Sequence, residues 1–231
     1  PISGQDHLGN VIAGTGALTG GSLSGVNNIG FGCDAANALT SGHNNVALGQ
    51  NALGASTTGC FNIGLGRTAL GGADLTGDAN IAMGIDPADA MTTGKCNIAI
   101  GTDALGASTT GCLNVAIGRT ALGGADLTGI DNISIGTDSS DALTTGNCNT
   151  VLGYAAYSQS TTGCLNIAIG ASALGISDTT GVNNIAIGSN TADALTTGAQ
   201  NIALGENALG VSTTGCFNVA IGATALGAGD T

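Results

Sequence analysis

A unit of 17 or 18 residues recurs along this chain from Asn10 onward, and this period constrains the fold more than any other feature. The unit can be followed from an asparagine that precedes an apolar triplet, as in Asn97-Ile98-Ala99-Ile100. Successive asparagines stand 17, 17 and 18 residues apart, so three steps span 52 residues. Asn10 opens a first, degraded copy, and we expect twelve regular copies to stack their asparagines along the molecule: Asn28, Asn45, Asn62, Asn80, Asn97, Asn114, Asn132, Asn149, Asn166, Asn184, Asn201 and Asn218.

Two glycines accompany each asparagine. One precedes it by three residues, from Gly25 to Gly215, and follows a Ser or Thr. The other comes four residues after the asparagine. Because glycine permits positive φ and close backbone approach, both columns predict turns. The later glycines are Gly32, Gly49, Gly66, Gly84, Gly101, Gly118, Gly136, Gly153, Gly170, Gly188, Gly205 and Gly222.

A large, a small and a large apolar residue lie between each asparagine and the later glycine. This alternation predicts a short strand with one buried face. We expect the large residues to point inward, beside Leu105 and Leu122: Ile98, Ile100, Val115, Ile117, Ile133 and Ile135. The small residues should then face outward and, with the asparagines, line an interface between identical chains: Ala99, Ala116, Ala168, Ala186, Ala203 and Ala220.

Repeats of this length are typical of solenoids, in which each coil buries its apolar edge against the next. The sequence therefore predicts an all-β parallel β-solenoid (a β-roll or β-helix) of about thirteen coils, grouped in 52-residue super-repeats. We expect residues 1–9 to be an entry segment and residues 10–231 one continuous repeat domain. The chain starts at Pro1 and stops within a repeat, which favours a fragment of a longer fibre.

Composition excludes several classes of partner. Three basic residues stand against fifteen acidic ones, giving a net charge of −12. Nucleic acids and anionic membranes are bound through Lys/Arg clusters, so we expect neither partner. No apolar run approaches the length of a membrane-spanning helix, so we expect no membrane insertion by this segment. Five Phe and Tyr residues in 231 predict a thin core of Ala, Ile, Leu and Val.

The repeat resembles a known group of surface fibres. The unit Asn-Ile-Ala-Ile-Gly-x-x-Ala resembles the head repeat of YadA-type trimeric autotransporter adhesins. The motif TTGxxNIAIGxxAL, present at 161–174, resembles repeats in phage and virus tail fibres. The resemblance covers nearly the whole chain from Asn10. It implies a β-roll wound as a homotrimer or filament at a cell or virion surface, with a host receptor or glycan as partner. The repeat is longer than the adhesin unit, and no coiled-coil heptads accompany it.

Seven cysteines are present, and four of them share the position two residues before the asparagine: Cys60, Cys112, Cys164 and Cys216. Members of this column are three coils apart, too far for a disulfide within one chain. Cys96 with Cys112, and Cys148 with Cys164, lie in adjacent coils and could bridge. The alternatives are small apolar fillers of a narrow turn, bonds between chains, or metal ligands. Only His7 and His43 could assist metal binding, so we expect no zinc site and no cofactor.

Two further side-chain ladders carry polar groups. Asp86 and Asp138 share one coil position, and Asp89, Asp141 and Asp193 another, which we interpret as solvated turn aspartates. Adjacent threonines in the Thr-Thr-Gly turns should point to opposite faces, leaving one hydroxyl per coil. These pairs are at 57–58, 92–93, 109–110, 144–145, 161–162, 179–180, 196–197 and 213–214.

No catalytic triad or phosphate-binding loop is present, so we expect no enzyme activity. The sequence favours a structural fibre protein that spans distance and presents a binding tip. The alternative is a ligand-binding solenoid that recognises ice or glycan through its Thr or Asn ladders.

Overall fold

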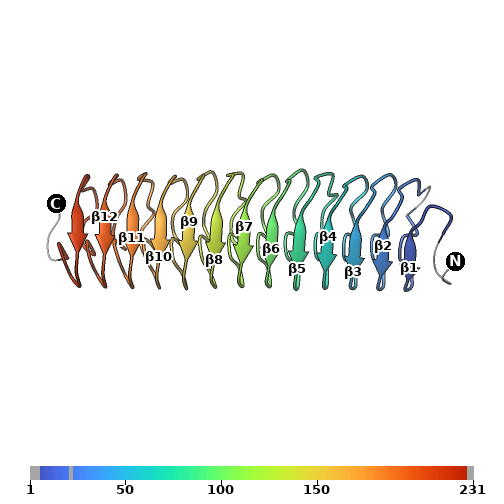
Figure 1. Ribbon diagram of the computed structural model, residues 1–231, viewed down its shortest axis with the longest axis horizontal. Coiled ribbons are helices and arrows are strands. Elements are labelled where there is room, and N and C mark those ends of the chain that lie inside the picture. The colour runs from blue at the N-terminus through green and yellow to red at the C-terminus, as the bar shows by residue number, and fades with distance from the viewer. Residues whose placement is uncertain (1–5, 21–22, 228–231) are drawn as a thin grey trace. The chain divides into compact units, whose positions relative to one another are not determined.

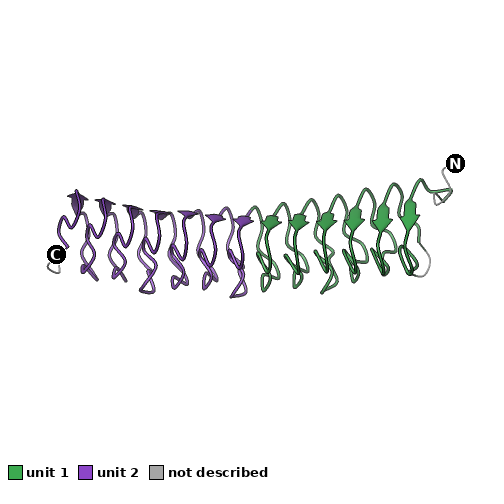
Figure 2. Ribbon diagram, turned by 90° about the horizontal axis from the view of Figure 1, so that it is seen from below, with its two compact units in different colours: residues 1–113 green, residues 114–231 purple. Residues whose placement is uncertain are grey.

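The computed structural model describes residues 6–20 and 23–227, and it divides into two compact units, residues 1–113 and 114–231 (Figure 2). All regular elements in the described ranges are three-residue strands. The first unit holds β1 (Val11–Ala13), β2 (Ile29–Phe31), β3 (Val46–Leu48), β4 (Ile63–Leu65), β5 (Ile81–Met83) and β6 (Ile98–Ile100). The second holds β7 (Val115–Ile117), β8 (Ile133–Ile135), β9 (Thr150–Leu152), β10 (Ile167–Ile169), β11 (Ile185–Ile187), β12 (Ile202–Leu204) and β13 (Val219–Ile221).

Within each unit, successive strands pair in parallel and in register (Figure 1). Ile29 lies opposite Val46 in the first unit, and Ile167 lies opposite Ile185 in the second. Backbone bonds also join the coils outside the strands, as where the Leu174 N–H donates to the Thr191 carbonyl at 3.0 Å. Each coil contributes one strand, so the predicted parallel β-solenoid is confirmed.

The predicted inward face of the strand is wrong. The small central residues are buried, Ala99 at 1% exposure and Ala116 at 0%. Their large neighbours are half-buried or exposed instead, and Ile133 is 42% exposed. The Ala column therefore lines the core and cannot form the predicted interface between chains.

The reason is the thinness of the coil. A Cβ added at Gly30, an inward strand position, would lie 2.9 Å from Leu18 Cγ, and one at Gly64 would lie 2.8 Å from the Ala69 carbonyl oxygen. Added volume at these two positions would displace the opposite side of the coil. The inward strand residue is Gly, Ala or Ser in β2 to β13, with Val151 of β9 as the larger exception. The bulk of the core comes from leucines of the turns, among them Leu105 and Leu122, which are fully buried as predicted.

The two glycine columns serve different purposes. The glycines after the strand have φ between 118° and 147°, where a Cβ is not tolerated. The earlier column has no such φ, but the next coil lies against it: a Cβ at Gly146 would overlap the Gly163 carbonyl oxygen. Three further positions per coil are left-handed without being glycine, as at Cys96 (φ 57°) and Leu105 (φ 52°).

Candidate functional surfaces

The predicted asparagines form a buried ladder within each unit. In the second unit, Asn132 donates its backbone N–H and its side-chain amide to Asn114 Oδ1, at 3.0 and 3.1 Å. The same amide donates to the Gly146 carbonyl of the following coil at 2.9 Å. Asn132 thus joins its own coil to both neighbours, and its polar atoms are satisfied inside the protein.

Asp6 takes the place of an asparagine at the start of the ladder in the first unit. Its Oδ1 accepts the N–H groups of Leu8 and Asn10, both at 2.9 Å, and its Oδ2 accepts the Asn10 amide at 2.9 Å. The hydrogen bond from the Asn10 side chain is the main cause that lowers the pKa of Asp6. Of the predicted entry segment 1–9, residues 6–9 are described, and Asp6 caps the first coil from there.

The large strand residues form an uncharged apolar surface on the outside of the sheet. They stand in two columns, before and after the buried small residue, and Thr150 is the polar exception among β2 to β13. The most exposed members include Phe31 at 59% and Leu152 at 47%. Monomeric proteins rarely expose contiguous apolar patches of more than a few hundred Å². The sequence analysis predicted these side chains in the core and therefore did not predict this apolar surface.

Exposed hydroxyls form a separate column at the residue before the earlier glycine, as at Thr58, Thr93, Thr145 and Thr197. The preceding threonine turns its hydroxyl inward along the stack: Thr144 Oγ1 donates to the Thr161 carbonyl at 3.0 Å. The Ser/Thr side chains of this column are exposed, the orientation that the sequence predicted, although Ser24, Thr76 and Thr128 donate their hydroxyls to carbonyls of the following coil.

The aspartate columns are less solvated than predicted. Asp86 and Asp138 pair with Arg67 and Arg119, the latter pair at 3.0 Å. Asp89, Asp141 and Asp193 are half-buried, and burial is the main cause that raises the pKa of each. Asp141 Oδ1 is buried and has no hydrogen-bond partner among the described residues.

All seven cysteines are free thiols. Neither candidate pair, Cys96–Cys112 or Cys148–Cys164, is joined. In the second pair the offset of one position is the reason, because Cys164 Sγ accepts the N–H of Asn147, the neighbour of Cys148, at 3.4 Å. Cys60 differs from the others of its column because its Sγ lies 3.0 Å from His43 Nδ1.

The described residues contain no pocket and no group of three or more metal-ligating side chains. They also include no helix of the length and apolarity needed to cross a membrane. Comparisons with protein-family models, with curated proteins and with solved structures gave no match to this chain.

Proposed function

We propose that this chain is a structural fibre protein, the shaft or head of an extracellular adhesin or a viral tail fibre. Its coils would span distance at a cell or virion surface and present a binding tip to a host receptor or glycan. The observation that carries the proposal is the uncharged apolar face of the sheet, since such a face needs a cover. Regular coils with in-register strands suit a mechanical role.

The cover that we propose is a second and third copy of the chain. The strands of two facing copies would repeat at the same spacing, so each coil could contact one coil of the other copy. Each coil of either copy offers two outward strand residues to this contact. The strand residues of the face carry no charge, so contact there brings no like charges directly together, and the net charge of −12 per chain acts only from a greater distance. A closed three-fold arrangement follows from the resemblance to adhesin heads and leaves no apolar face open.

The solution mass of the chain tests this proposal. The wild type should elute at three times its mass of 21.8 kDa in light-scattering chromatography. A sheet-face variant, Ile133→Ser with Leu152→Ser, should elute closer to 21.8 kDa. The matched control is Ile176→Ser with Val211→Ser, which removes two exposed apolar side chains outside the strands and should keep the assembly. A wild type that stays at the mass of one chain would contradict the apolar-face interface.

A second candidate function is ligand binding by the exposed Ser/Thr column. One solvent-facing hydroxyl per coil could recognise ice or the hydroxyls of a glycan. A thermal-hysteresis assay and a glycan array test it, with Thr93→Val and Thr145→Val as variants. Activity that these variants reduce, in a protein that keeps its mass, would favour this role.

A further inference from the structure

One thiol of the cysteine column has an imidazole beside it. Cys60 and His43 occupy the same position in adjacent coils of the first unit, and Cys60 Sγ lies 3.0 Å from His43 Nδ1. The Phe61 ring packs edge-on against the His43 ring, with centroids 5.3 Å apart. Both Cys60 and His43 are half-buried rather than enclosed, so a small reagent can reach the sulfur.

The thiol proton has two acceptors at this site. Cys60 Sγ lies 3.4 Å from the Thr58 carbonyl oxygen and 3.0 Å from His43 Nδ1. A thiol carries a single proton and cannot donate it to both. With Nδ1 unprotonated, the imidazole is the nearer acceptor and the stronger base, so it is placed to take the thiol proton as the sulfur attacks.

The rest of the column shows what the site would be without the histidine. Cys112, Cys164 and Cys216 each place Sγ 3.3 to 3.5 Å from the carbonyl of the threonine two residues earlier, as Cys60 does. In place of His43 the preceding coil offers Asn147 to Cys164 and Ala199 to Cys216, each through its backbone N–H. The backbone setting is therefore shared, and the basic side chain distinguishes Cys60 from these two.

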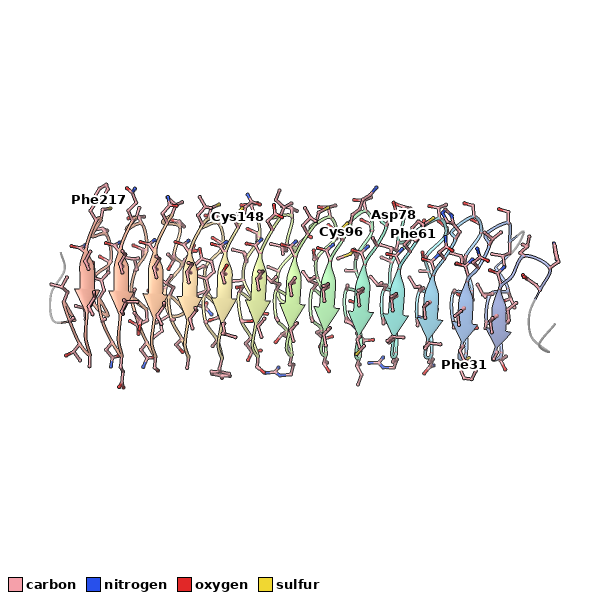
Figure 3. The ribbon with its side chains drawn as sticks, viewed as in Figure 1. Phe31, Phe61, Asp78, Cys96, Cys148 and Phe217 are labelled. Atoms are coloured by element: carbon pink, nitrogen blue, oxygen red, sulfur yellow. The ribbon has the colours of Figure 1, made fainter. Side chains whose placement is uncertain are left out.

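The following coil places a carboxylate near Cys60, and its charge is balanced. Asp78 Oδ1 accepts the Cys60 N–H at 3.0 Å, and Asp78 Oδ2 lies 3.4 Å from Lys95 Nζ. Phe61 and Asp78 lie along the same edge of the first unit (Figure 3). The Lys95 ammonium offsets the repulsion that the Asp78 carboxylate would exert on a thiolate.

We propose that Cys60 and His43 form a reactive thiol site for covalent modification by small disulfides. The Cys60 sulfur attacks one sulfur of a disulfide R–S–S–R, a Cys60–S–R bond forms, and the S–S bond breaks. His43 takes the thiol proton and passes it to the departing R–S⁻, which leaves as R–SH. The products are a mixed disulfide on Cys60 and one free thiol, with no other oxidant consumed. This inference does not depend on the fibre function.

Thiol–disulfide exchange with a neutral dipyridyl disulfide tests the site in the full chain. The reaction is stopped at intervals, and peptide masses give the rate at each cysteine. An ordinary thiol is only a few per cent thiolate at pH 7. Because an imidazole is in place to take the thiol proton, we expect Cys60 to react about tenfold faster than Cys112 and Cys164, which are buried to a similar degree. Equal rates at the three positions would overturn the proposal.

Two variants separate the contribution of the His43 imidazole to the Cys60 rate from other influences on that rate. His43→Ala should slow Cys60 to the rate of Cys164 while the rates at Cys112, Cys164 and Cys216 stay unchanged, which also shows that the fold is intact. Ala199→His places an imidazole before Cys216, and it should raise the rate there by a similar factor. An unchanged Cys60 rate in His43→Ala would overturn the role of the histidine. If His43→Ala unfolds the chain, the rates at all cysteines should rise together, and the test then rests on Ala199→His. Faster reaction at Cys216 in that variant supports the proposal, and an unchanged rate overturns it.

Discussion

Asn149 donates both its backbone N–H and its side-chain amide to one atom, Asn132 Oδ1, each at 3.0 Å. The same amide donates to the Gly163 carbonyl at 2.8 Å, and Asn149 Oδ1 accepts the Asn166 N–H at 3.0 Å. One buried side chain therefore donates to the preceding and the following coil and accepts from the following coil. Only a neutral amide supplies both roles at this size, since a carboxylate lacks the donors and a hydroxyl lacks the reach.

The first prediction follows from this geometry. Asn149→Asp retains the acceptor but turns a carboxylate toward two oxygens, Asn132 Oδ1 and the Gly163 carbonyl. We expect it to destabilise the second unit by about 3–5 kcal/mol, because a buried charge is left without a partner. Asn149→Ala should cost less, about 1–3 kcal/mol for each group that it leaves unsatisfied. Urea unfolding followed by circular dichroism measures both.

The control for the ladder is Asn183→Ala. Asn183 is exposed and left-handed, and Ala79 occupies the equivalent position in the first unit, so alanine is acceptable there. If Asn149→Ala shifted the urea midpoint no more than Asn183→Ala does, the ladder would contribute little to stability.

The second prediction separates backbone strain from collision at the glycine turns. Gly136 has φ 141°, and a Cβ there would overlap the Gly153 carbonyl oxygen; Gly222 has φ 118°, and a Cβ there would meet nothing within 4 Å. Gly222→Ala should therefore cost only the strain of the left-handed region, about 1–3 kcal/mol. Gly136→Ala should cost clearly more, because the stacked coils must also move apart. Melting temperatures of the two variants give the comparison, and equal losses would mean that coil contact is not limiting.

The third prediction concerns the two kinds of large apolar residue. Leu174 is fully buried, whereas Ile167 on the strand is half-buried. In separated chains, Leu174→Ala should cost about 2–5 kcal/mol, and Ile167→Ala about half of that or less. Unfolding below the concentration at which chains associate measures this difference. If Ile167→Ala cost more than Leu174→Ala in separated chains, the large strand residues would point inward, as the sequence predicted, and the structure would be contradicted.

The coil, its strand and its glycine turns could be predicted from the sequence because they depend on the repeat period and on residue types with strong conformational preferences. The positive φ of Gly136 is an example, since glycine is the residue that readily adopts positive φ. Which face of the strand is inside could not be predicted in the same way. An Ile-Ala-Ile triplet alternates equally well in either orientation. The usual preference for large residues inside fails here because buried leucines of the turns, such as Leu174, supply the bulk of the core, and the strand contributes small residues such as Ala168.

The left-handed non-glycine residues were also missed, and only part of the signal was available. Asp103 and Asn207, both left-handed, belong to residue types that tolerate this conformation. Leu105 and Phe217 do not belong to such types. The Phe217 N–H donates to the Ala199 carbonyl of the preceding coil at 3.1 Å, a contact between coils that local residue preference does not reveal. The contact between His43 and Cys60 was within reach, because the two residues share a coil position 17 residues apart. We did not predict it because we considered His43 only as a possible metal ligand.

The fourth prediction uses the half-buried carboxylate of Asp141. Burial raises its pKa above the ordinary value of 3.8, and the nearby Asp138 raises it further. The folded chain therefore binds a proton at a higher pH than the unfolded chain does, so ionised Asp141 costs stability at neutral pH. As the pH falls through the raised pKa toward 3.8, the wild type should recover that stability. Asp141→Asn removes the cost, and Asn37 already occupies the equivalent position in the first unit.

We therefore expect Asp141→Asn to melt at a higher temperature than the wild type at pH 7, by a margin that shrinks as the pH approaches 4. Asp141 Oδ1 is buried without a hydrogen-bond partner among the described residues, so replacing the carboxylate by an amide breaks no hydrogen bond of that atom. Asp131→Asn, at an exposed carboxylate, changes the net charge equally and serves as the control. Melting temperatures of the three proteins across this pH range decide the matter. A margin that is independent of pH, or that Asp131→Asn reproduces, would assign the effect to net charge rather than to the burial of Asp141.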